Sequence, residues 1–481
     1  MKTLKTMIIT ILSLSVLLAI GTSSQAYNGW IDGTPLLHEE SMSLLRVIGR
    51  DSRPALAPGA EVVGNTPMYK VGDVQKFYAL NTTNNRQYVL EATCYTVSDK
   101  AYIFVEKGIS VTPNKIDALA NSFNQIYDNI IKIYGAPPEK FSNDPRIDFL
   151  IMDIIDGAKR NGVMMLGYFS PIDQFLNTEL APLTRMKSNE TNMLYIDYVS
   201  LNSDKISADS IVAHEFTHLV QWARNPDEST WVDEGIAVYT EAILGYDVKD
   251  QISAFEQNSS ISLLDWTNTV EDYGAAYLFF DYLSERFGGT PLISDIVKNT
   301  AQDVDGIVKT LSSHGMSTSF NEVFSDWVIA NYLDDPKLEN GRYGYSNLDV
   351  KLNPSVVESQ YPIIQKQSSV LPWSAQYIEF TKGQDNVLSL NVSENNQNDI
   401  NARLIGVDSE GKVSVSSIKL DNTASVSRED SKAILVTTSQ PDPPDSKQNK
   451  SVYAYSAESR VVGLAVTPSG SKITTWGSIK K

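Results

Sequence analysis

The feature that most constrains this chain is a pair of histidines four residues apart in a stretch suited to a helix. Residues 210–222 contain no glycine or proline, and they include the sequence His-Glu-Phe-Thr-His from His214 to His218. Residues four apart lie one turn from each other on a helix face, so both imidazoles can reach one metal ion at about 2.0–2.1 Å. Glu215 points about 100° away around the helix, where it is better placed to receive a proton from a metal-bound water than to bind the metal.

Composition argues against a coincidental match. The 481 residues include only four histidines, and a chance match to this pattern on a surface helix is on the order of one in several hundred. The other two, His38 and His314, have no neighbours that suggest a metal site. The single cysteine, Cys94, can form neither an intramolecular disulfide nor a thiolate zinc cage. We expect it to be buried in a strand-like run.

A catalytic zinc ion normally has three protein ligands and one open position, so a third ligand is needed. One extended zinc-binding motif supplies its third ligand from a histidine at position 224, after a glycine at position 221. This motif is excluded, because the chain has Gln221 and Arg224 there. The best donor is Glu234, which we expect on the first turn of a second helix capped by Thr230 and Asp233.

Two alternatives to this assignment stay open. Glu241 lies two turns beyond Glu234 on the same helix face and is the main rival ligand. Glu234 could instead be a first-turn acid that interacts favourably with the helix dipole. In either case residues 225–229 form a turn that lets the two helices fold face to face.

A later helix, around residues 271–280, carries tyrosines that could stabilise a developing negative charge. A tyrosine hydroxyl is a suitable hydrogen-bond donor to an oxyanion. Tyr273 is the first choice and Tyr277 the second. Since the chain has 23 tyrosines, ordinary core packing is an equally good explanation for either.

The N-terminus has the layout of a secretory signal peptide. Lys2 and Lys5 precede an apolar run from Met7 to Ile20, and small residues lead to an expected cleavage site after Ala26. The run is too short to span a bilayer comfortably, although an uncleaved anchor is the alternative. No second run of spanning length follows. We therefore expect a secreted mature chain without a membrane anchor, and the absence of disulfides suggests a bacterial source.

The length and the charge restrict the organisation and the partners. A chain of 481 residues is too long for one core, so several domains are expected. With 40 basic and 58 acidic residues the net charge is -18, which argues against nucleic-acid binding. We predict a signal peptide at 1–26, a β-rich segment or removable pro-segment at 27–110, a metal-binding domain at 111–350 and a β-sandwich at 365–481.

Local patterns support these divisions. A helix is expected over 113–134, since Thr112 and Pro113 suit its first residues and Gly135 its end. Residues 146–152 and 192–198 read as strands, the second half-exposed because apolar and polar residues alternate. Helices dominate from about 208 to 335, with a capping box at residues 319–322. After about 365 the apolar residues recur with a period of two, which is typical of an antiparallel sandwich.

The sequence resembles the zincin metallopeptidases of the gluzincin type, and in particular the hyicolysin-like secreted bacterial neutral metalloproteases. The likeness covers about residues 113–335 and is carried by His-Glu-Phe-Thr-His, by the Trp-Val-Asp-Glu-Gly-Ile-Ala segment that contains Glu234, and by Tyr-Gly-Ala-Ala-Tyr-Leu-Phe from Tyr273. It implies an α+β fold, with a zincin-like domain of mixed sheet and helices between the β-rich segment and the sandwich. It also implies that an edge strand, here within 192–200, binds the substrate backbone.

The resemblance further implies His214, His218 and Glu234 as zinc ligands and Glu215 as the catalytic base. Tyr273 matches less closely, because Gly274 follows it at once. The expected function is a secreted zinc-dependent endopeptidase with one catalytic Zn²⁺, protein or peptide substrates and a monomeric state. The alternatives are an aminopeptidase on the same scaffold and a non-catalytic secreted surface-binding protein. Acid-rich loops could hold Ca²⁺, but no twelve-residue calcium loop supports this.

Overall fold

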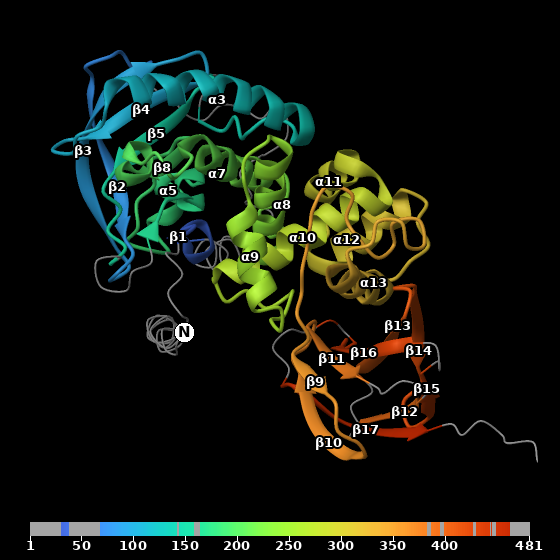
Figure 1. The fold of residues 1–481 in the computed structure, drawn as a ribbon. Helices are drawn as coiled ribbons and strands as arrows, with labels where there is room; N and C mark the ends of the chain where they lie inside the picture. Colours follow the sequence, from blue (N-terminus) through green and yellow to red (C-terminus); the bar gives the residue numbers. More distant parts are fainter. Residues whose placement is uncertain are drawn as a thin grey trace, which may run out of the picture. The chain divides into compact units, whose positions relative to one another are not determined.

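The computed structural model describes residues 30–37, 68–141, 144–157, 164–381, 386–394, 399–426, 430–442, 444 and 449–461. The predicted signal peptide and the strand expected at 462–466 lie outside these residues. The chain divides into two compact units (Figure 1). Unit 1 comprises Met1–Ser41, Val63–Ser122 and Phe141–Val212, and unit 2 comprises Met42–Val62, Phe123–Lys140 and Ala213–Lys481.

Unit 1 contains a six-stranded mixed sheet with the order β2-β3-β4-β5-β8-β7. The strands β2, β3 and β4 are antiparallel, β4, β5 and β8 run parallel, and β7 is antiparallel to β8. Their bounds are Val74–Asn81 (β2), Arg86–Val97 (β3), Ala101–Glu106 (β4), Ile147–Met152 (β5), Gly167–Phe169 (β7) and Met193–Asp197 (β8). The mixed α and β character is therefore confirmed. The strands β2, β3 and β4, which lie within the predicted N-terminal segment 27–110, share one sheet with β5 and β8. The domain boundary at 110 stays a prediction.

The expected edge strand at 192–200 is wrong. The strand β8 lies between β5 and β7, so both of its hydrogen-bonding sides are occupied. A two-residue strand β1 (Trp30–Ile31) pairs in parallel with β6 (Met164–Met165), just before β7. These two strands form a separate small sheet, and the outer strands of the six-stranded sheet are β2 and β7. This order depends on pairings between segments far apart in sequence, which no local pattern could indicate.

The strand β8 is also not half-exposed, as its alternation suggested. All five of its residues are buried, because parallel strands in the middle of a sheet are covered on both faces. Its polar residues have buried partners instead. Asp197 accepts hydrogen bonds from the backbone amides of Ile154 (3.0 Å) and Val199 (2.8 Å), and Tyr195 donates to Asp173 (2.6 Å). Burial raises the pKa of Asp197 to about 6.

The helices confirm most of the sequence expectations. The helix α3 (Pro113–Tyr134) begins at the predicted proline and ends at Gly135, which has a positive φ of 100°. Ser319 and Glu322 form the predicted capping box, at the start of α13 (Phe320–Leu333). The other main helices are α7 (Ala208–Trp222), α8 (Thr230–Ile243), α9 (Lys249–Gln257), α10 (Val270–Phe287), α11 (Gly289–Lys298) and α12 (Asp303–Ser313). None of the described helices is long and apolar enough to cross a membrane.

The C-terminal part of unit 2 consists of two sheets, coloured orange to red in Figure 1. One has the order β14-β13-β16-β11-β9 and the other β10-β17-β12-β15. Apolar residues from both sheets form one buried cluster, as in a sandwich. Except for β9, which is parallel to β11, the neighbouring strands are antiparallel. The bounds are Val356–Glu358 (β9), Ile363–Val370 (β10), Ala375–Thr381 (β11), Asn386–Glu394 (β12), Ile400–Asp408 (β13), Val413–Ile418 (β14), Thr423–Ser425 (β15), Asp430–Ser439 (β16) and Ser451–Val461 (β17).

The helix α13 packs against this sandwich. The hydroxyl of Tyr377 donates a buried hydrogen bond to the carbonyl of Val328 (2.7 Å), and its ring stacks on Tyr332 at 5.0 Å between centroids. Trp373 contacts the rings of Phe320 and Phe324 at 5.0 and 5.3 Å. Because buried aromatic pairs of this kind contribute strongly to packing, the sandwich is an integral part of unit 2.

We predict that Tyr377→Phe lowers the free energy of unfolding by about 1 kcal/mol, because it removes one buried hydrogen bond and keeps the ring. Urea unfolding would measure the change. The matched control is Tyr95→Phe. Tyr95 is 41% exposed, so removal of its hydroxyl should leave the free energy of unfolding unchanged. Equal unfolding midpoints for Tyr377→Phe and the unmodified protein would contradict the proposed contribution of this contact.

Candidate metal centre

Two helices carry the candidate ligands, and all three ligand residues belong to unit 2. His214 and His218 lie one turn apart on α7, with ring centroids 4.7 Å apart. Glu234 lies on α8 as predicted, but one residue beyond the first turn, whose acid is Asp233. The predicted cap of α8 is wrong, however. The helix starts one residue earlier, with Ser229 as N-cap, and no side chain makes a capping bond because the Ser229 hydroxyl donates to Glu228 (3.3 Å) instead.

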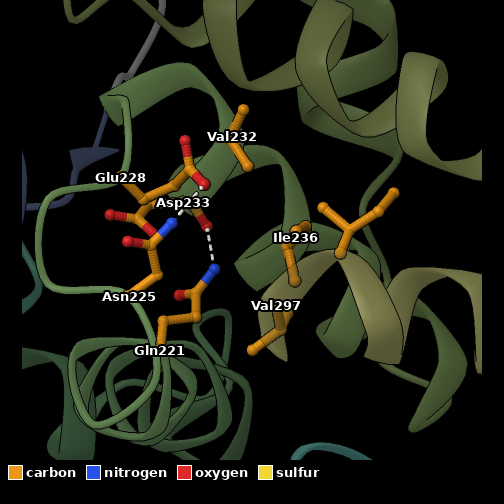
Figure 2. Close-up of a pocket in the computed structure, with 8 residues that line it drawn as sticks. Gln221, Asn225, Glu228, Val232, Asp233, Ile236 and Val297 are labelled. Atoms are coloured by element: carbon orange, nitrogen blue, oxygen red, sulfur yellow. Dashed lines mark hydrogen bonds between the residues drawn. The ribbon is translucent and has the colours of Figure 1, made fainter. Parts of the chain in front are cut away.

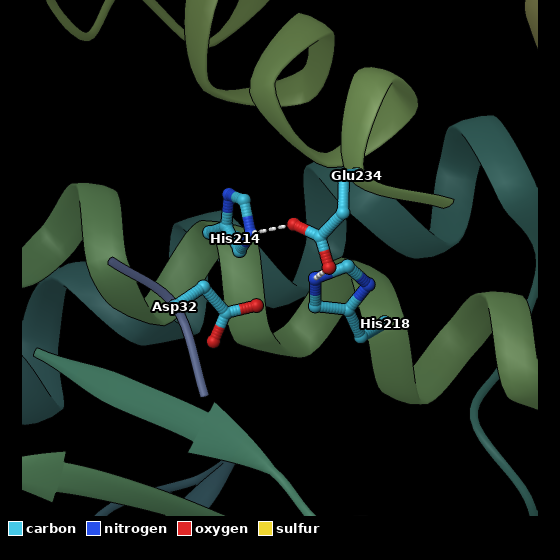
Figure 3. Close-up of side chains that lie close together, drawn as sticks. All are labelled: Asp32, His214, His218 and Glu234. Atoms are coloured by element: carbon cyan, nitrogen blue, oxygen red, sulfur yellow. Dashed lines mark hydrogen bonds and ion pairs between the residues drawn. The ribbon is translucent and has the colours of Figure 1, made fainter. Parts of the chain in front are cut away.

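The three side chains meet in the interior (Figure 3). Nε2 of His214 lies 3.2 Å from one carboxylate oxygen of Glu234, and Nε2 of His218 lies 3.3 Å from the other. At least one ligand atom of each lies within 4.8 Å of the others, and none of the three side chains is more than 6% exposed. Asp32, also drawn in Figure 3, belongs to unit 1.

The other nitrogen of each imidazole has its own partner. Nδ1 of His214 lies 2.7 Å from a carboxylate oxygen of Glu241, and Nδ1 of His218 lies 3.1 Å from the side-chain oxygen of Gln221. Gln221 also donates from Nε2 to the carbonyl of Asp233 (3.0 Å), which connects α7 to α8 beside Glu234. Acceptors at Nδ1 fix the tautomer in which Nε2 carries a lone pair.

These contacts test whether a metal fits. Two neutral imidazoles that present lone pairs to a carboxylate repel it, and a cation among the three groups removes that repulsion. Ligand atoms bound at about 2.05 Å to a tetrahedral zinc ion are about 3.3 Å apart. The two nitrogen–oxygen distances agree with this spacing. The donor set and its geometry therefore suit a zinc-like ion.

The structure separates the two acids that competed as third ligand. The carboxylate of Glu234 faces the Nε2 atoms of both histidines. The carboxylate of Glu241 instead contacts the other ring nitrogen of His214, Nδ1. The contact of Gln221 was missed, although its position three residues after His218 on one helix face was a usable signal. Glu215 is buried on α7, and its role as base stays a prediction.

Tyr273 lies near the histidines on α10. Its ring centroid is 6.4 Å from that of His214, and its hydroxyl donates to the side chain of Asn268 (3.1 Å). The close approach of α10 to α8 depends on Gly235, where a Cβ would lie 2.6 Å from the ring of Phe280. The alternative, Tyr277, is buried one turn later, and burial raises its pKa well above the usual value. An oxyanion role for either tyrosine stays a prediction.

The other candidates lie apart from this centre. Cys94 is buried in β3 of unit 1, and burial raises the pKa of its thiol to about 11. His314, at the end of α12, contacts Asp295 (2.9 Å). His38 lies outside the described residues. No second group of three metal-binding side chains occurs among the residues that the structure describes, and calcium binding gains no support.

A small pocket lies beside Gln221 (Figure 2). It is lined by Gln221, Asn225, Glu228, Val232, Asp233, Ile236, Ile296 and Val297. The carboxylate of Glu228 is buried and accepts hydrogen bonds from Asn225 (2.9 Å) and the amide of Asp303 (2.6 Å). Burial nevertheless raises its pKa to about 7 and raises that of Asp233 well above its usual value. The ligand-bearing part of α8 thus lies beside two buried acids whose pKa values are raised by burial.

Comparison with known proteins identifies a relative. The chain is 22% identical over 339 residues to the neutral metalloprotease ShpI of Staphylococcus hyicus, a match that covers 66% of this chain and 75% of ShpI. No family model matches the chain. The similarity supports a metalloprotease relationship.

We predict that Glu241→Gln weakens Zn²⁺ binding about 10-fold or more, because the charged partner of His214 Nδ1 becomes neutral while its shape is kept. Competition with a chromophoric chelator would measure the affinity. Glu139→Gln, a change at an exposed helix-loop position, is the matched control. An affinity equal to that of the unmodified protein would show that Glu241 does not support the ligand.

The buried carboxyl of Glu228 predicts a pH dependence of stability. Its pKa is raised from 4.5 to about 7, so between these values the folded state holds a proton that the unfolded state releases. The free energy of unfolding then decreases as pH rises from about 4.5 to about 7. Glu228→Gln should reduce this decrease in thermal melts at pH 4.5–8. Asp305→Asn, at a side chain that is 84% exposed, should leave it unchanged. The same slope in Glu228→Gln and the unmodified protein would refute this assignment.

Proposed function

We propose that this chain is a secreted zinc-dependent endopeptidase of the gluzincin type. The observation that carries the proposal is the convergence of two imidazole Nε2 atoms on the carboxylate of Glu234, at 3.2 and 3.3 Å. His214, His218 and Glu234 would hold the ion. Three protein ligands leave a fourth position open, which is typical of catalytic rather than structural zinc sites.

A bound Zn²⁺ supplies a water with a pKa lowered to about 7 and polarises the scissile carbonyl. Glu215 accepts the proton of the attacking water and delivers it to the leaving amine. Its place supports this role, because it is buried at 2% exposure on the same helix as both histidines. The hydroxyl of Tyr273 donates a hydrogen bond to the oxyanion of the tetrahedral intermediate. Before substrate binds, its hydrogen bond to Asn268 holds the Tyr273 side chain in place.

The relative supports the substrate class. ShpI is named a neutral metalloprotease, and proteins or peptides are therefore the proposed substrates of this chain. Secretion through the signal peptide agrees with this function. An aminopeptidase on the same scaffold would require groups that bind a free α-amine, and the site offers no specific observation in its favour.

We predict that Glu215→Gln abolishes casein hydrolysis while Zn²⁺ binding is retained, because the substitution removes the proton acceptor and none of the proposed ligands. Hydrolysis would be followed by release of labelled peptides, and metal content by elemental analysis. Glu410→Gln, at an exposed turn of the sandwich, is the matched control and should remain active. A zinc chelator should stop hydrolysis by the unmodified protein.

Full casein hydrolysis by Glu215→Gln would overturn the mechanism. Peptides with blocked and free N-termini decide between the two peptidase types. Equal cleavage of both, at internal bonds, supports an endopeptidase, whereas cleavage of the free peptide alone supports an aminopeptidase.

A further inference from the structure

The loop between α9 and α10, residues 258–269, contacts Tyr273 at two points. The ring of Trp266 lies edge-on to the ring of Tyr273, with centroids 4.7 Å apart and an angle of 78° between the planes. The side-chain oxygen of Asn268 accepts a hydrogen bond from the Tyr273 hydroxyl at 3.1 Å. One contact holds the ring and the other holds its polar end, so the orientation of the Tyr273 side chain depends on this loop.

Asp272 fixes the last residues of the loop. One oxygen of its carboxylate accepts hydrogen bonds from the amides of Thr267 (3.0 Å) and Thr269 (2.9 Å) and from the hydroxyls of both threonines (2.8 and 3.2 Å). Asp272 is buried, so water competes little for these bonds. Asn268, between the two threonines, has a φ of 61°, a left-handed conformation that asparagine adopts more readily than most residues. The four bonds therefore hold Asn268 in the conformation in which it accepts from Tyr273.

The sandwich holds the middle of the same loop. The amide of Leu263 donates to the carbonyl of Trp373 (2.8 Å), and the amide of Trp373 donates to the carbonyl of Ser439 in β16 (2.7 Å). Leu263 and Trp373 are both buried, which keeps water away from this connection. The position of Trp266 is therefore fixed from both directions along the chain, by Leu263 before it and by the bonds to Asp272 after it.

The backbone of Trp373 is strained at the point where the sandwich meets the loop. Its φ is 54°, which is rare for a bulky side chain. Such a conformation persists only where the surrounding contacts impose it, and it often marks a functional position. Here the rings of Phe320 and Phe324 hold the side chain, and the two backbone hydrogen bonds hold the main chain. The strained residue is thus the one that links the sandwich, α13 and the loop.

We propose that residues 258–269 are a positioning loop for Tyr273, and that the sandwich takes part in catalysis by holding this loop through Trp373. This inference rests on the proposed function, which gives Tyr273 its role at the oxyanion. A hydrogen-bond donor stabilises an oxyanion best when it is oriented before the reaction, because reorientation costs free energy at the transition state. Trp266 and the backbone of Leu263 are therefore positioning residues, which affect the rate through Tyr273 and not through contact with substrate.

The first test is a double-mutant cycle on the full-length protein. Trp266→Ala should lower kcat for an internally quenched peptide about 10-fold and leave KM nearly unchanged, because the lost interaction is made in the transition state. In the Tyr273→Phe background the same substitution should change kcat by less than about 2-fold, since the hydroxyl that it positions is absent. Trp266→Phe should keep most of the activity. Phenylalanine retains an aromatic ring there, and the buried indole nitrogen has no hydrogen-bond partner among the residues that the structure describes.

Met316→Ala, at a residue after α12 that is 36% exposed, is the matched control and should match the unmodified protein. Equal losses of kcat with and without the Tyr273 hydroxyl, or a large rise in KM, would show that Trp266 is only structural and would overturn the inference. Full activity of Tyr273→Phe would overturn it as well. If Trp266→Ala has no melting transition, Trp266→Leu takes its place in the cycle.

Hydrogen exchange tests the connection to the sandwich independently of catalysis. Leu263→Pro removes the amide hydrogen that bonds to Trp373, so the amides of Thr267 and Thr269 should exchange about 10-fold faster or more. Leu263→Ala keeps that hydrogen bond and should change their exchange far less. Unchanged exchange in Leu263→Pro, or equally fast exchange in Leu263→Ala, would refute the role of the sandwich. If exchange follows the expectation but the unmodified protein hydrolyses no peptide, the proposed function fails and the anchored loop stands.

Discussion

The candidate site depends on the way in which α7 and α8 are joined by hydrogen bonds behind the metal ligands. Glu241 reaches from α8 to His214, and Gln221 reaches from α7 to the backbone of α8 beside Glu234. Each link crosses between the helices, so neither imidazole can rotate without breaking one of them. In a buried environment such bonds are strong because water does not compete for the donors. A site arranged in this way is ready for a metal before the metal arrives, and the cost of ordering the side chains is met during folding.

The surroundings of α8 explain how a helix with several buried acids is tolerated. Glu234 and Glu241 face the imidazoles, whereas Asp233 and, just before the helix, Glu228 line a small pocket. Asn225 donates a hydrogen bond to Glu228 there, and burial raises the pKa of both pocket acids. On the third side Gly235 allows α10 to approach closely and brings Tyr273 toward His214. The sandwich contacts α13 through rings and one buried hydroxyl. These contacts make the helical part of unit 2 a rigid support for the site.

Which parts of this arrangement can be predicted from the sequence depends on how far apart in sequence the interacting residues lie. The helix that carries His214 and His218, and the placement of Glu234 on the next helix, could be predicted because helical spacing is local. The cap of α8 was misplaced by one residue, since Ser229 bonds to Glu228 rather than to the helix. The edge strand was misassigned because strand order depends on distant pairs, and the two-residue strand β1 is too short to have a pattern. The role of Glu241 could not be told from that of Glu234, because both lie on one helix face and only packing decides which oxygen reaches which nitrogen.

The contact of Asn189 with the edge of β2 has a consequence for the association of the protein with other chains. Exposed strand edges recruit other chains, and natural sheets avoid this by covering or interrupting them. Asn189 does so at Tyr78, where one side chain bonds to both the amide and the carbonyl, whereas residues 30–34 cover residues 164–169 with backbone and side-chain contacts. Without the contacts of residues 30–34, backbone groups of residues 164–169 would be open to pairing with other chains. The fold therefore confines the risk of edge-to-edge association on this side of the sheet to residues 164–169.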